Sequence, residues 1–170
     1  MTLRRVLGVT AGVALLIAVF AGGWLTGRLG IGSVVEPESL TELEREFTER
    51  MREVSLVGSF TVAGREDRQP RADRYDIESV EKVGDDLWRF NVSMSCCGLD
   101  GTTVPIAVPM TWVGDTPMIM MTDTSLPGIG IFTARVFFYS DRYAGTWQHE
   151  AVGGLMSGRI EPQGNTTEAE

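Results

Sequence analysis

The hydrophobic pattern of the chain changes twice, and each change separates two kinds of element. Residues 6–27 form an apolar run without a charged side chain. From Leu40 to Val54 the apolar residues recur at spacings of three and four, which is the period of an amphipathic helix. Beyond Val54, apolar and polar residues alternate as they do in half-buried strands. The pattern predicts a transmembrane helix, an amphipathic helix and then a mainly β domain.

Turn residues divide the alternating region into about eight strands. Most connections are too short for parallel crossovers, so neighbouring strands are expected to pair antiparallel. This order fits an up-and-down, calycin-like barrel, which we prefer, or alternatively a two-sheet sandwich. Pro105 and Pro109 each remove a ladder donor, which places their strand at an edge or beside a bulge. The predicted strands are 56–63, 75–83, 87–97, 103–113, 116–122, 131–139, 143–149 and 155–161.

The amphipathic helix is expected over residues 39–54. Ser39 opens the sequence Ser-Leu-Thr-Glu, in which the first hydroxyl and the fourth carboxylate fit a capping box. Arg50 occupies a position that a continuous heptad would keep apolar. The helix is therefore expected to pack on its own domain, with a coiled coil as the second interpretation.

The apolar run is long enough to cross a membrane once. Its 22 residues would span about 33 Å as a helix. Arg4 and Arg5 precede it, so the positive-inside rule places the N-terminus in the cytoplasm and the β domain outside the cell membrane. The alternative is a signal peptide cleaved after Ala21, and both interpretations export the domain. The paired glycines Gly8–Gly12 and Gly23–Gly27 match the spacing that allows a homodimer through the anchor.

These elements divide the chain into six segments. They are a cytoplasmic N-terminus (1–5), a transmembrane helix (6–27), a linker (28–38), the amphipathic helix (39–54), an antiparallel β domain (55–162) and a disordered tail (163–170).

Charge argues against nucleic acid as a partner. Only Arg4, Arg5 and Arg28 of the 15 basic residues precede Glu36, whereas all 23 acidic residues lie at or beyond it. An exported part with 12 basic and 23 acidic residues would repel a phosphate backbone.

The reactive side chains suggest no enzyme. His149 is the only histidine, and none of the common catalytic or phosphate-binding motifs occurs, so we expect no catalytic residues, no cofactor and no metal. Cys96 and Cys97 are adjacent and point to opposite faces of a strand, which disfavours a bond between them and leaves their redox state open. A methionine cluster is interpreted as core in preference to a copper site; it comprises Met110, Met118, Met120 and Met121.

Four residues are candidates for ligand binding. Tyr143, Trp147 and His149 share one face of their strand, which in a barrel could look into a cavity. The alternative is that Trp147 is core and His149 lies at the rim. Arg135 lies in a strand with large apolar residues on both faces, so its charge must be paired or reach water. It is either a structural ion-pair partner or a site for an anionic group.

Five further segments are distinctive: Leu56–Val62, Arg74–Ile77, Trp112–Pro117, Phe132–Val136 and Tyr143–His149. Together they resemble an uncharacterised family of membrane-anchored bacterial envelope proteins, and the resemblance covers roughly residues 40–161. It implies an envelope setting and no particular activity. Gly145-Thr146-Trp147 is also similar to a segment of lipocalin and avidin-type barrels, although in lipocalins that segment opens the first strand.

The sequence thus predicts a non-catalytic, membrane-anchored module that binds a small apolar ligand or a protein partner. The alternative is a structural protein whose contacts are homotypic, through the anchor and the helix. Whether the interior of the β domain is open or filled distinguishes these two functions. An open apolar interior favours ligand binding, whereas one filled by Trp88, Phe90, Trp112 and Trp147 favours surface contacts.

Overall fold

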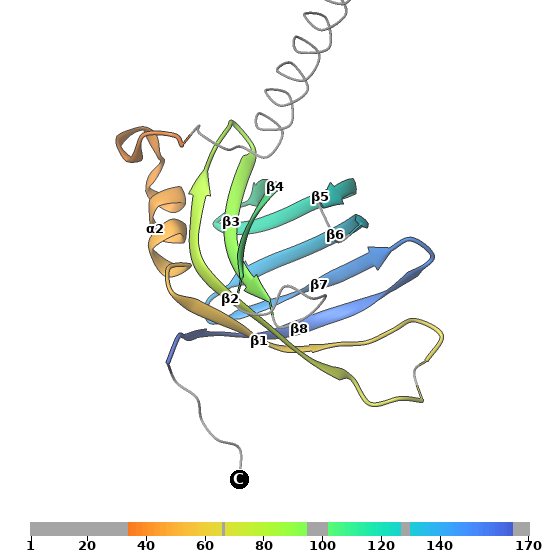
Figure 1. Ribbon diagram of the computed structural model, residues 1–170. Helices are drawn as coiled ribbons and strands as arrows, with labels where there is room; N and C mark the ends of the chain where they lie inside the picture. The colour runs from red at the N-terminus through yellow and green to blue at the C-terminus, as the bar shows by residue number, and fades with distance from the viewer. Residues whose placement is uncertain (1–33, 66, 95–101, 127–129, 165–170) are drawn as a thin grey trace, which may run out of the picture.

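A computed structural model describes residues 34–65, 67–94, 102–126 and 130–164. Eight antiparallel strands close into one barrel, in which each strand pairs with the next and β1 pairs with β8 (Figure 1). A short 3-10 turn, η1 (Pro37–Ser39), and a helix, α2 (Glu42–Arg50), precede the barrel. The strands are β1 (Val54–Phe60), β2 (Arg71–Lys82), β3 (Leu87–Met94), β4 (Thr103–Val113), β5 (Thr116–Leu126), β6 (Gly130–Tyr139), β7 (Arg142–His149) and β8 (Val152–Pro162).

The structure confirms the barrel and excludes the sandwich. The ladder between β1 and β8 closes the sheet on itself, since all seven residues of β1 pair with β8 on one side and with β2 on the other. The strands differ from the prediction mainly at their ends. β2 begins at Arg71, before the predicted start at residue 75, because Arg71 pairs with Phe60.

The helix begins later and ends earlier than the predicted 39–54. Ser39 belongs to η1, whose first residue is Pro37, and Thr41 is the N-cap of α2. The capping box therefore lies two residues downstream of the expected one: the Thr41 hydroxyl accepts from the Glu44 N–H at 3.3 Å, and the Glu44 carboxylate accepts from the Thr41 N–H at 2.9 Å. At the other end, Glu53 adopts φ 52° as the chain turns into β1.

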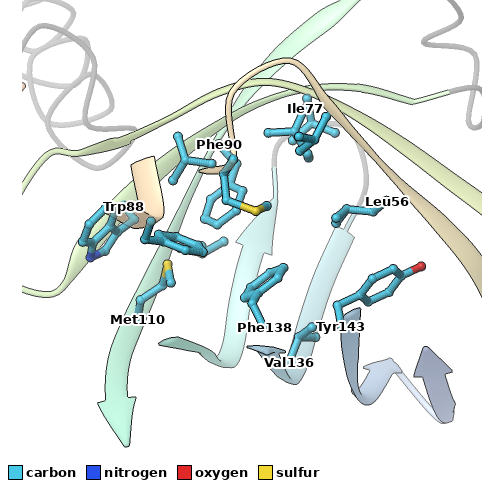
Figure 2. Close-up of a cluster of buried hydrophobic side chains, with 14 of the residues drawn as sticks. Leu56, Ile77, Trp88, Phe90, Met110, Val136, Phe138 and Tyr143 are labelled. Atoms are coloured by element: carbon cyan, nitrogen blue, oxygen red, sulfur yellow. The ribbon is translucent and has the colours of Figure 1, made fainter. Parts of the chain in front are cut away.

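Helix α2 packs on its own domain, as predicted, and covers one end of the barrel (Figure 1). Phe47 and Met51 are buried, and the Phe47 ring lies 5.8 Å from Trp88, 5.9 Å from Trp112 and 5.6 Å from Phe138 between centroids. We call these four rings the aromatic plug; Figure 2 shows Trp88 and Phe138 among the buried cluster. A 2.6 Å ion pair between Lys82 and Glu44 ties the helix to β2.

Strand β4 has the partial edge character that its prolines predict. It pairs with β3 from Thr103 to Pro109, so both prolines lie within that ladder. Among the described residues, its ladder with β5 extends only over Met110–Val113. The proline nitrogens, which cannot donate, are thus tolerated where the pairing is one-sided.

Three predictions concern residues outside the described ranges. These are the transmembrane helix at 6–27 with its cleavage alternative, the Cys96–Cys97 pair, and most of the tail 163–170. Within the described ranges, none of the helices has the length and hydropathy needed to cross a bilayer.

Candidate ligand-binding cavity

The barrel encloses a cavity of about 450 Å³ to which every strand contributes at least one side chain. Most of the lining is aliphatic or aromatic, as in Leu56, Ile106 and Val136. The cavity extends from Phe138 of the aromatic plug and the neighbouring Phe90 ring to Phe60, Leu126 and Trp147 near the opposite strand ends. We call that opposite end, where the β1–β2 and β7–β8 connections lie, the mouth (Figure 1). The volume of the cavity is typical of small-molecule binding sites.

The bulky aromatic residues leave the middle of the barrel open because they gather at its ends. Trp88 and Trp112 belong to the plug, where both contact Phe47 edge-on. Trp147 lies toward the mouth, where its ring meets Phe60 edge-on at 5.5 Å. Its indole Nε1–H donates to the Thr61 carbonyl at 3.2 Å, which fixes the ring against the end of β1.

Of the four predicted site residues, the structure brings two into the cavity wall. Tyr143 and Trp147 both line the cavity, on the inward face of β7. His149 ends the same strand and stacks on Phe132, a lining residue, with ring centroids 4.5 Å apart and planes 9° apart. His149 is therefore a rim residue that supports the wall by stacking.

Arg135 lies on the outer face of β6, since its neighbours Ala134 and Val136 line the cavity. Its guanidinium donates to the carbonyl of Met121, to that of Ala134 at 2.8 Å, and to the Thr122 hydroxyl at 2.8 Å. Met121 borders the irregularity at which the β5–β6 register shifts. The bonding partners are neutral oxygens of the protein, which gives Arg135 a structural role at that irregularity.

The sequence prediction missed Asp73, the charged residue of the lining. It lies before residue 75, where that strand was predicted to begin, and the pairing of Asp73 with Gly58 shows that Asp73 belongs to β2. Burial raises the pKa of its carboxyl, while hydrogen bonds from Tyr75 and from the Arg74 N–H act to lower it. The alternation of β2 with Tyr75 and Ile77 was the available signal, because Asp73 shares their face.

Tyr143 is the second unusual group in the lining. It is 1% exposed, and its hydroxyl finds no hydrogen-bond partner among the described residues. Burial, and then the nearby Asp73, raise the pKa of this phenol to about 12. The hydroxyl is therefore neutral and can donate one hydrogen bond.

The described part of the chain contains no group of three or more His, Cys, Asp or Glu side chains arranged to hold an ion. None of the protein-family models matches this chain, and no significant match was found among curated proteins or solved structures.

Proposed function

We propose that the β domain is a non-catalytic binding module that holds a small, mostly apolar ligand inside the barrel. The observation that carries this proposal is the apolar cavity of about 450 Å³. Displacing weakly held water from such a lining is favourable in proportion to the apolar area covered. At about 30 Å³ for each water-sized group, the space suits a ligand of about 15 non-hydrogen atoms.

We further propose that residues 6–27 hold this module at the outer face of a bacterial cell membrane. The apolar run and Arg4–Arg5 support this setting, as does the resemblance to envelope proteins. The Val35 N–H bonds to the Lys82 carbonyl at 2.9 Å, so the N-terminal chain joins the barrel at the end that α2 covers. An anchor attached there would turn the mouth away from the bilayer. The ligand would then arrive from the envelope space or from a partner protein.

A homotypic structural role is the second candidate. The apolar stripe of α2 is already buried against the barrel through Phe47 and Met51, which leaves little of it for another chain. The outer wall, however, exposes Val113 and Tyr139 by 62% and 63% of their surface. A contact between copies would bury apolar surface at these two residues.

Native mass spectrometry of the full chain in lipid nanodiscs tests both candidates. We expect a monomer that carries a co-purified adduct. Ala134→Phe, which projects a ring into the cavity, should remove the adduct. Ala144→Phe adds the same ring at an alternate position of β7 outside the cavity lining and should keep it. An adduct carried equally by both variants, or by neither variant nor wild type, would contradict ligand binding. A dimer without an adduct would favour the homotypic role.

A further inference from the structure

Two glycines shape a hollow in the inner wall, and Tyr143 fills it. Gly158 pairs with Tyr143 on one side and with Gly58 on the other, and Gly58 pairs with Asp73. The four residues therefore form one row across β7, β8, β1 and β2. A Cβ at Gly158 would lie 2.6 Å from Tyr143 Cε1, and one at Gly58 would lie 2.6 Å from the Tyr143 hydroxyl oxygen. The ring thus lies along the wall over both glycines.

This arrangement carries the phenol hydroxyl toward Asp73. The hydroxyl reaches Gly58, whose neighbour in the adjoining strand is Asp73, and the two groups interact electrostatically. Figure 2 shows the Tyr143 oxygen projecting away from the hydrocarbon side chains of the buried cluster. Among the described residues the hydroxyl has no hydrogen-bond partner. A buried hydroxyl without a partner is costly, so a molecule that supplies one is favoured there.

We infer that Tyr143 and Asp73 together bind the polar head of the ligand, and that this head is a hydrogen-bond donor, either a hydroxyl or an amine. The inference rests on the proposed function, because it assigns the orientation of a ligand inside the same cavity. A hydroxyl accepts from Tyr143 and donates to Asp73, which satisfies both groups at once. An amine donates to the Asp73 carboxylate and, when protonated, also neutralises it.

The same pair discriminates against anionic heads. A carboxylate would stand beside the Asp73 carboxylate in a space lined otherwise mainly by hydrocarbon, where like charges repel more strongly than in water. An ether can accept from Tyr143 but donates nothing to Asp73. The ligand class is therefore an apolar chain or ring system that ends in an alcohol or an amine.

Four probes with one octyl chain test the head group: octanol, octylamine, octanoate and octyl methyl ether. Binding is measured by calorimetry on the full chain in lipid nanodiscs, with empty nanodiscs as background. Wild type should bind octanol about tenfold more tightly than the ether, because a hydrogen bond to a charged acceptor is worth about that factor. Octanoate should bind most weakly.

Three variants separate the roles of the two groups. Tyr143→Phe should weaken octanol and the ether alike, by about threefold to tenfold, because both oxygens lose the same donor. Asp73→Leu should abolish the preference for octanol over the ether. Asp73→Asn keeps an acceptor without the charge and should retain part of that preference while losing octylamine. Met156→Leu, at another lining position, should leave the ranking of the four probes unchanged.

Two results would overturn the inference, and they are distinguishable from a failure of the proposed function. Equal affinity of wild type for all four probes would mean that the cavity binds the chain without recognising the head. A preference for octanol that survives Asp73→Leu would place the head elsewhere. Failure of every probe to bind wild type would sink both the inference and the ligand-binding function.

Discussion

At the scale of single residues, the interior is shaped by missing side chains as much as by those present. Gly58 and Gly158 leave room for the Tyr143 ring, and a Cβ at Gly154 would lie 3.3 Å from the Trp147 indole nitrogen. Each glycine therefore permits an aromatic ring to lie against the wall and not across the cavity. Such residues look like weak strand positions in the sequence, because glycine is poorly suited to strands.

Gly158→Ala is expected to destabilise the protein. The new methyl group would meet Tyr143 Cε1 at 2.6 Å and also press on the Val57 carbonyl, and such overpacking costs about 1 to 3 kcal/mol. Urea unfolding of the variant measures this loss. Gly84→Ala is the matched control: a Cβ there meets only Leu87 Cβ at 3.3 Å, so its free energy of unfolding should change little. Equal effects of the two substitutions would show that the Tyr143 hollow is not tightly packed.

The candidate site residues show which side chains near the cavity could be predicted from the sequence. Tyr143 and Trp147 were found because they share one face of an evident strand. Arg135 was singled out because its charge lies among apolar residues, and the structure resolves that conflict on the outer wall with backbone oxygens as partners. Asp73 escaped notice because the strand was predicted to begin at residue 75, so the alternation of Tyr75 and Ile77 was not extended back to Asp73.

At the scale of elements, α2 covers one end of the barrel and packs against it mainly through the Phe47 ring. Phe47 is 1% exposed and contacts the other three rings of the aromatic plug, whereas Leu43 on the same helix is 41% exposed. The periodicity predicted the buried positions Phe47 and Met51 correctly, but it also placed Leu43 on the apolar stripe, and that side chain is exposed. The periodicity could not say which surface the stripe would cover.

Phe47→Ala should lower the free energy of unfolding by about 3 to 5 kcal/mol, because it removes a buried ring and leaves a void beside the cavity. Leu43→Ala, on the exposed side, should change it by no more than about 0.5 kcal/mol. Chemical denaturation of both variants gives the comparison. Similar losses from the two would mean that α2 does not close the barrel through Phe47.

The ion pair beneath α2 gives the stability a dependence on pH. Burial acts to raise the pKa of Glu44, but hydrogen bonds from Lys82 and from the Thr41 N–H outweigh it and leave the pKa below its ordinary value of 4.5. A carboxyl whose pKa is lowered by folding stabilises the protein fully above its unfolded pKa. That stabilisation is lost as the pH falls through the folded pKa.

Glu44→Gln should therefore destabilise the protein by about 1 to 3 kcal/mol at neutral pH, and the difference from wild type should shrink as the pH falls below 4.5. Urea unfolding at neutral and acidic pH measures both values. Glu42→Gln removes the exposed pair with Arg45 and should have little effect at either pH. A difference between wild type and Glu44→Gln that is constant with pH would count against the ion pair.

At the scale of the whole molecule, closure is what creates an interior. Val54 pairs with Pro162, which follows it by more than a hundred residues in the sequence. This pairing of β1 with β8 closes the eight strands into a barrel with an interior. The connections between successive strands then lie alternately at the two ends of the barrel. One receives α2 and the incoming chain, and the other forms the mouth.

The proposed anchor predicts how the whole protein fractionates. The full chain should remain with membranes after washing with high salt and alkaline carbonate, because about 20 apolar residues insert effectively irreversibly. Deletion of residues 6–27 should move the protein to the soluble fraction. A mature chain whose mass shows that it begins at Gly22 would support the cleaved signal peptide and exclude the anchor.

The sequence by itself determined the type and order of the elements, because helix and strand periods are local properties of neighbouring side chains. It also set the unequal distribution of charge and the apolar run of residues 6–27. Only the tertiary structure decided between barrel and sandwich, since that choice depends on whether β1 meets β8. The same closure decided that the Trp88 and Trp112 rings fill an end while the middle stays open. It also set Tyr143 and Asp73 on one row, because register between strands is a contact between distant residues that no local pattern encodes.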